Sequence, residues 1–138
     1  MRPPEEVARD LVRQWFAKAD KDFNLASELV SENKPYPEAV GFHSQQAAEK
    51  YLKAFLVHHQ VNFPKTHNIG QLLDLAASAD QSLADSLRET TALNPYAIQT
   101  RYPDDQQEVT SEDAKAAVEM ADKVRRAVLE ALGLPEEE

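Results

Sequence analysis

Residues 42–56 have the sequence FHSQQAAEKYLKAFL, and this stretch decides the fold. Its apolar side chains recur every three or four positions, the spacing of one face of an α-helix. They are Phe42, Ala48, Tyr51, Leu52, Phe55 and Leu56. We therefore expect a helix from about Glu38 to about Gln60.

The same spacing predicts helices on both sides of this stretch. An N-terminal helix begins after Pro3 and Pro4 and ends at the segment 33–37, because the two prolines of that segment cannot lie in a helix interior. Residues 61–68 lack the spacing and contain a proline, so we expect a loop there. A short helix should follow over residues 69–77.

A fourth helix is expected after Asp80–Ser82, which can cap its start. Ser82 and Asp85 have the spacing of a capping box. The buried side of this helix is expected to carry three leucines, namely Leu83, Leu87 and Leu93. A break is predicted near Asn94 and Pro95, followed by an irregular segment over residues 96–107.

The last helix has clear signals at both ends. Thr110 and Asp113 form a second capping-box pattern, and Gly133 followed by Pro135 is typical of a helix stop near Leu132. The sequence thus predicts an all-α protein, an up-and-down bundle of four main helices plus one short helix. We expect a single domain over residues 1–138, with an acidic tail at 134–138.

Composition limits the functions open to this chain. Its 138 residues carry 15 basic and 24 acidic side chains, a net charge of −9, which argues against broad nucleic-acid binding. It has no cysteine, so it forms neither disulfides nor thiolate metal sites. No apolar run approaches the roughly 20 residues of a membrane span, and the N-terminus lacks a signal-peptide core. We expect a cytoplasmic protein that does not bind membranes.

Several chemical motifs are missing from the sequence. Neither common phosphate-binding glycine loop occurs, and there is no H-E-x-x-H pair. The adjacent His58 and His59 would point about 100° apart on a helix, so they cannot chelate one ion together. We expect no metal, no cofactor and no catalytic residue of these classes.

Two stretches are candidates for binding an anion. His43, Gln46, Lys50 and Lys53 fall within about 80° on one helix and form a stripe of hydrogen-bond donors. The alternative for this stripe is a solvated face.

Arg101 and Tyr102, followed by a proline and two aspartates, form the second candidate stretch. Arginine pairs with phosphate through two hydrogen bonds, and a tyrosine ring can stack on a base. The alternative is a turn in which Arg101 pairs with an acidic neighbour. We predict that the two stretches line one polar cleft for a nucleotide or other anion, formed by His43, Gln46, Lys50, Lys53, Arg101 and Tyr102.

The chain resembles the HEPN domain family in three stretches that keep the family's order and spacing. They are FHSQQAAEKYLKAFL at 42–56, KTHNI at 65–69 with two leucines at 72 and 73, and RYPD at 101–104. The resemblance implies a four-helix bundle that commonly forms homodimers. It also implies nucleotide binding and pairing with a minimal nucleotidyltransferase in toxin–antitoxin-like modules.

One branch of that family cleaves RNA, using an arginine followed after four to six residues by a histidine. This chain departs from that pattern, because its last histidine, His67, precedes Arg101 and only Asp104 and Asp105 follow closely. Metal-independent cleavage needs a proton acceptor near the 2′-hydroxyl, so we predict no ribonuclease activity. The alternatives are a ribonuclease with a degenerate site and a dimerisation module without a ligand.

A homodimer is also expected on physical grounds. The first two helices carry large apolar residues on more than one side, and a monomer of this size would struggle to cover them all. These residues are Trp15, Phe16, Phe23, Phe42 and Phe55.

Overall fold

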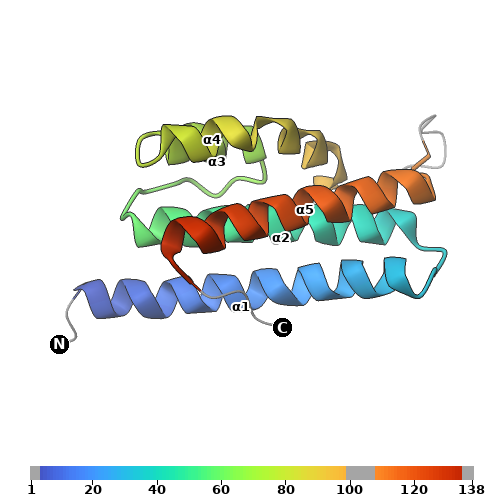
Figure 1. The fold of residues 1–138 in the computed structure, drawn as a ribbon, viewed down its shortest axis with the longest axis horizontal. Coiled ribbons are helices and arrows are strands. Elements are labelled where there is room, and N and C mark those ends of the chain that lie inside the picture. The colour runs from blue at the N-terminus through green and yellow to red at the C-terminus, as the bar shows by residue number, and fades with distance from the viewer. Residues whose placement is uncertain (1–3, 99–107, 135–138) are drawn as a thin grey trace.

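A computed structural model describes residues 4–98 and 108–134, and within these ranges every regular element is a helix. The all-α prediction is therefore confirmed. Three long helices lie side by side, and three short ones form a further layer (Figure 1). The long helices are α1 (Pro4–Ser31), α2 (Pro37–His58) and α5 (Ser111–Leu132); the short ones are α3 (Ile69–Ala77), α4 (Gln81–Ser86) and the 3₁₀ helix η1 (Arg88–Ala97).

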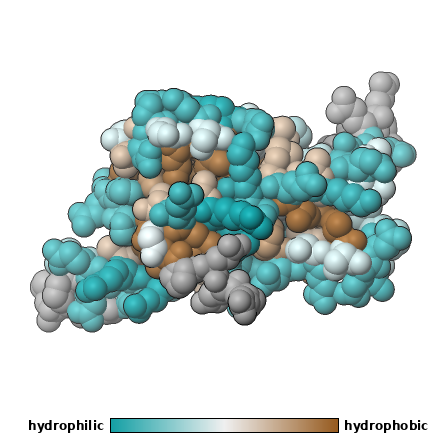
Figure 2. Space-filling model, viewed as in Figure 1, coloured by the Kyte–Doolittle hydropathy of each residue, from teal (hydrophilic) through white to brown (hydrophobic). Residues whose placement is uncertain are grey.

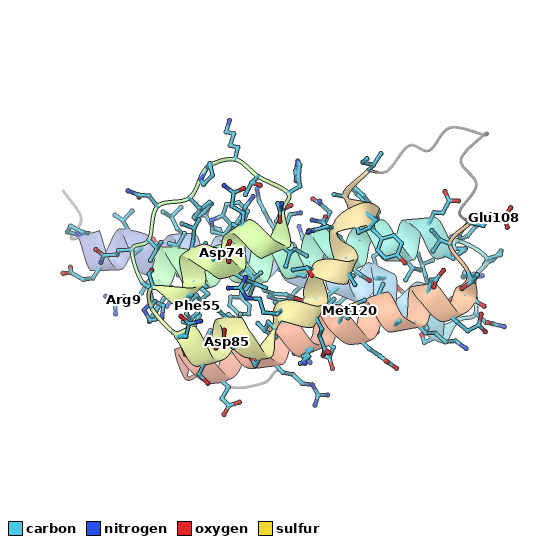
Figure 3. The ribbon with its side chains drawn as sticks, turned by 90° about the horizontal axis from the view of Figure 1, so that it is seen from above. Arg9, Phe55, Asp74, Asp85, Glu108 and Met120 are labelled. Carbon is cyan, nitrogen blue, oxygen red and sulfur yellow. The ribbon has the colours of Figure 1, made fainter. Side chains whose placement is uncertain are left out.

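Helix α2 is the centre of the bundle. It packs against α1 on one side and against α5, α3 and η1 on the other, whereas α1 and α5 touch each other far less. Four of its large side chains, Tyr51, Leu52, Phe55 and Leu56, are fully buried; Figure 3 shows Phe55 in the interior near α3. Burying such a side chain stabilises the fold by roughly 1.5–3 kcal/mol. The stretch that predicted the fold is thus the one that forms its core.

The ends of the long helices have local causes. Asn33 adopts a left-handed φ of 56° after α1, and Pro37 is the first residue of α2. At the start of α5, the Thr110 side chain accepts from the Asp113 amide while the Asp113 side chain accepts from the Thr110 amide. Gly133 ends the helix with a φ of 68°. The predicted capping box and glycine stop of the last helix are therefore confirmed.

The capping box predicted at Ser82 and Asp85 is wrong. Asp80 is the cap, and its Oδ1 accepts from the Leu83 amide at 3.0 Å. Asp85 instead accepts from the Gln81 side chain at 2.8 Å. Asp80 has the extended backbone that a cap requires, so it takes the role before Ser82 can.

The predicted fourth helix is divided into two short elements. After α4 the chain tightens into η1, which contains Pro95. Two threonine hydroxyls, those of Thr90 and Thr91, donate to the carbonyls three residues earlier. Such local side-chain bonds compete with α-helical pairing. This explains why three apolar positions at helical spacing do not produce one long helix here.

Tyr96 of η1 packs directly on a glycine of α2. A Cβ added at Gly41 would lie 2.7 Å from the nearest ring carbon of Tyr96. The missing side chain at this position therefore lets η1 approach α2. Residues 99–107, which include Arg101 and Tyr102, and residues 135–138 of the acidic tail lie outside the described residues.

Candidate functional site

The polar face of α2 packs against α1 and the loop 61–68 instead of facing open solvent. Its donors converge on two carboxylates. One group, called here the Asp22 cluster, consists of Asp22, His43 and Lys50. The other, called the Glu49 cluster, consists of Gln45, Glu49, Lys53 and His67.

In the Asp22 cluster, one carboxylate of α1 holds two donors of α2. His43 Nδ1 lies 2.8 Å from Asp22 Oδ1, and Lys50 Nζ lies 2.6 Å from Asp22 Oδ2. All three side chains are mostly buried. Both oxygens are therefore occupied, and the pairing ties the middle of α1 to α2.

In the Glu49 cluster, a carboxylate of α2 joins the helix to the loop that follows it. Lys53 Nζ donates to Glu49 Oε2 at 3.0 Å, and His67 Nδ1 lies 2.8 Å from Glu49 Oε1. The Glu49 side chain is only 4% exposed. Gln45 Nε2 also donates to the His67 carbonyl at 2.9 Å, so two side chains of α2 fix the position of His67.

The Lys53 ammonium group is enclosed by aromatic rings as well as by Glu49. It lies 5.4 Å from the ring centroid of Trp15 and 5.8 Å from that of Phe63. These rings attract a cation through their electron-rich faces. Because its side chain is only 9% exposed, Lys53 could bind a ligand only by leaving this enclosure.

A third buried contact links Tyr51 of α2 to α1. The Tyr51 hydroxyl donates to Asp20 Oδ1 at 2.6 Å. Burial, followed by this hydrogen bond to Asp20, raises the pKa of Tyr51 well above its ordinary value. Tyr51 is therefore a neutral donor at any physiological pH.

These contacts show where the predicted cleft residues lie. His43 and Lys50 meet at Asp22, whereas Lys53 belongs to the separate Glu49 cluster. Gln46 donates to the Gln45 side chain at 2.7 Å. Arg101 and Tyr102 lie outside the described residues, so the single cleft stays a prediction. The stripe follows the predicted spacing, but its cations already face carboxylates, and Asp22 comes from another helix.

Sequence reasoning missed a groove between α1 and α5. It has a volume of about 590 Å³. Its lining consists of Arg9, Val12, Arg13, Phe16, Ala17 and Asp20 from α1, His58 from α2, Arg125, Leu129 and Leu132 from α5, and Leu134. Three of the chain's seven arginines thus meet at one hollow. The signal was present in the four-, three- and four-residue spacing from Arg9 through Arg13 and Phe16 to Asp20, which places them on one face of α1.

Among the described residues, no group of three or more potential ligands could hold a metal ion. His58 and His59 lie at the end of α2 with ring centroids 5.0 Å apart. Burial, followed by the neighbouring His58, lowers the pKa of His59. None of the described helices is long and apolar enough to cross a membrane.

Comparison with known proteins gives two matches. Residues 12–132 match the profile of the HEPN domain. The chain is also 26% identical over 124 residues to a protein of Methanocaldococcus jannaschii named "Putative toxin MJ1304", covering 80% of each chain. No solved structure gives a significant match.

The Glu49 cluster generates a stability prediction. Glu49→Ala leaves the buried Lys53 ammonium without its carboxylate, so we expect the free energy of unfolding to fall by about 3–5 kcal/mol. Urea denaturation followed by circular dichroism measures this loss. Asp74→Ala is the matched control, because Asp74 pairs with Arg88 at the exposed surface and should cost less than about 1 kcal/mol. Equal losses in the two variants would contradict the role given to Glu49.

Proposed function

Because the chain belongs to the HEPN domain family, we propose that it is a toxin-like protein that binds a nucleotide or a nucleotidyltransferase partner and does not itself cut RNA. Its similarity to a protein named as a toxin supports a place in a toxin–antitoxin-like module. The net charge of −9 favours a compact anionic ligand or a protein partner over a long nucleic acid.

The observation that carries the proposal is that the hydrogen-bond donors of α2 pair with carboxylates inside the bundle. Asp22 holds His43 and Lys50, and Glu49 holds Lys53. A ribonuclease site needs an imidazole free to take a proton from the 2′-hydroxyl and cations free to face the phosphate. Instead His43 and Lys50 join α2 to α1, and Lys53 pairs within α2, which supports a binding scaffold.

One contact favours the second candidate, a ribonuclease with a degenerate site. A carboxylate can only accept hydrogen bonds, so Glu49 fixes the tautomer in which His67 Nδ1 carries the proton. In the neutral ring the other nitrogen is a proton acceptor, on a side chain that is 69% exposed. An imidazole oriented in this way has the form of a general base.

We predict no cleavage when the pure protein is incubated with a structured RNA at neutral pH without added metal. Gel electrophoresis of the labelled RNA measures the outcome, and a long incubation excludes slow turnover. Cleavage that disappears in both Arg101→Ala and His67→Ala would contradict the prediction and establish the second candidate. Cleavage that both variants retain would indicate a contaminating nuclease, and the protein would be purified again until wild type and variants can be compared.

A homodimer is a further part of the proposal, and the apolar surface of α1 supports it. Of the aromatic residues that predicted it, Phe55 is buried, and Phe16 and Phe23 pack against the core. The exposed apolar residues Val7, Leu11 and Leu25, each about 40% exposed, instead lie within about 40° on α1. Such an exposed stripe is typical of an interface.

Light scattering at micromolar concentration should give the mass of a dimer. Leu11→Glu places a charge beside Val7 in the exposed stripe and should shift the mass to that of a monomer without loss of helical circular dichroism. Asn24→Glu, at an exposed position of α1 about 100° around the helix from Leu25, serves as the control and should stay dimeric. A monomeric wild type would contradict the proposed homodimer.

Ligand binding is tested by thermal unfolding with a panel of nucleotides. A nucleotide present at about a hundredfold excess over its Kd should raise the Tm by roughly 5–10 °C. A parallel test co-expresses the tagged chain with any minimal nucleotidyltransferase found encoded beside its gene and asks whether the two purify together. No Tm shift and no co-purification would contradict the proposal and leave the dimerisation module.

A further inference from the structure

We propose that the groove between α1 and α5 binds a nucleoside monophosphate of adenine or cytosine, the bases with an exocyclic amine where guanine and uracil have a keto oxygen. The phosphate lies at Arg9 and Arg13, the base lies over Phe16, and the amine faces Asp20. This inference rests on the proposed function, because it names the nucleotide class and the surface that takes it. Four features of the groove carry it.

The first feature is a pair of available arginines at one end of the groove. Arg9 makes no ion pair with any described residue, and Arg13 Nη1 is 3.7 Å from Asp10 Oδ1 with a side chain 79% exposed. An exposed pair of this length contributes little, so it does not hold Arg13 in place. The two residues are about 6 Å apart along the helix axis, on the same face. Two guanidinium groups so placed suit one phosphate, whose oxygens accept paired hydrogen bonds.

Figure 3 shows Arg9 at the end of the bundle where α1 begins and α5 finishes. A third arginine is fixed on the opposite wall. Arg125 Nε and Nη2 donate to Asp122 Oδ1 at 3.1 and 3.0 Å, and its guanidinium lies 5.2 Å from the ring centroid of Phe23. Arg125 therefore adds positive charge to the groove wall without having to move.

The second feature is an apolar floor. Between the charged residues lie Val12, Phe16, Leu129 and Leu132. The Phe16 ring is half-buried and is supported from behind by Tyr51, with ring centroids 5.2 Å apart. On the face seen in Figure 2, apolar surface appears near the C-terminal end of α5, with hydrophilic residues beside it. A volume of about 590 Å³ lies within the range of small-molecule sites, and a nucleobase can stack on an aromatic ring.

The third feature is the carboxylate at the other end. Asp20 Oδ1 accepts from the Tyr51 hydroxyl, and Asp20 Oδ2 has no partner among the described residues. Asp20 follows Arg13 by seven residues, about 10 Å along the axis. A carboxylate repels phosphate and accepts from an amine, so the two ends of the groove set the direction of the ligand. Adenine and cytosine present an amine donor, whereas a keto oxygen at the same position would face the carboxylate unfavourably.

The fourth feature is the contrast between this groove and the whole protein. The chain carries a net charge of −9, yet the groove is lined by three arginines and one aspartate. A local positive region in a negative protein concentrates small anions there. Arg125 pairs with Asp122, just as the cations on the stripe of α2 pair with Asp22 and Glu49, so the contrast comes from Arg9 and Arg13.

Isothermal titration calorimetry with AMP, IMP, adenosine and inorganic phosphate tests the proposal. AMP and IMP differ at C6, which carries an amine in AMP and a keto oxygen in IMP, and at the adjacent N1, which carries a hydrogen only in IMP. We expect AMP to bind at least tenfold more tightly than IMP, adenosine or phosphate. Arg9→Ala and Arg13→Ala should each weaken AMP binding about tenfold. Asp20→Asn should reduce the preference for AMP over IMP, and circular dichroism verifies that each variant is folded.

The control is Arg88→Ala, which removes an arginine that pairs with Asp74 far from the groove; it should bind AMP as the wild type does. AMP binding that is lost in Lys50→Ala and Arg101→Ala but kept in Arg9→Ala and Arg13→Ala would overturn the groove while leaving nucleotide binding intact. Phosphate binding as tight as that of AMP would overturn recognition of the base. A wild type that binds none of the four would overturn the inference, and the proposed function would then depend on the co-purification test.

Discussion

An ionised glutamate and an ionised lysine face each other inside this bundle, and the arrangement around them depends on that pair. Removing two charges from water costs several kcal/mol per ion, and their mutual attraction offsets this only with good geometry and further hydrogen bonds. Here those further contacts come from other parts of the chain. His67 of the loop completes the hydrogen bonding of Glu49, and the rings of Trp15 on α1 and Phe63 of the loop face Lys53. The pair is therefore fully surrounded only when α1 and the loop 61–68 are both correctly placed against α2.

The cost of burying an unpaired charge also explains why the basic side chains of α2 are paired with carboxylates. Lys50, Lys53 and His43 each contact a carboxylate, and Asp22 takes two of these contacts. The contacts of Asp22 give α1 one favourable position against α2, and the contact of His67 with Glu49 does the same for the loop 61–68. A shift that separates a buried charge from its partner costs several kcal/mol, in addition to any loss of apolar packing. We interpret the polar face of α2 as the feature that selects one packing arrangement.

The sequence was sufficient for what depends on neighbouring residues. The apolar spacing of residues 42–56 predicted the buried helix, and the reciprocal bonds of Thr110 and Asp113 appear as their three-residue spacing indicated. The same kind of pattern failed at Ser82, because Asp80 two residues earlier has the backbone that a cap needs. A local pattern shows only that a residue can cap a helix. The backbone conformation decides whether Asp80 or Ser82 does so.

Contacts between distant residues were harder to predict. The stripe on α2 has the predicted spacing, but Asp22 lies 21 residues before His43, and nothing in either stretch identifies the other as its partner. The groove is a stronger case, since Arg13 and Arg125 belong to opposite ends of the chain. Its α1 face could have been found from the spacing of its polar residues. The wall formed by α5 could not be predicted, because the sequence alone does not show that α5 lies alongside α1.

The weak direct contact between α1 and α5 has a mechanical consequence. Each of these helices is attached to α2 along its length, and each is attached to the other at few points. A molecule bound in the groove would therefore add contacts between two helices that otherwise meet at few points. Such a molecule would hold α1 and α5 at one separation. Its stiffening effect would extend along both helices, far past the atoms it touches, and slow amide hydrogen exchange in α1 and α5 together.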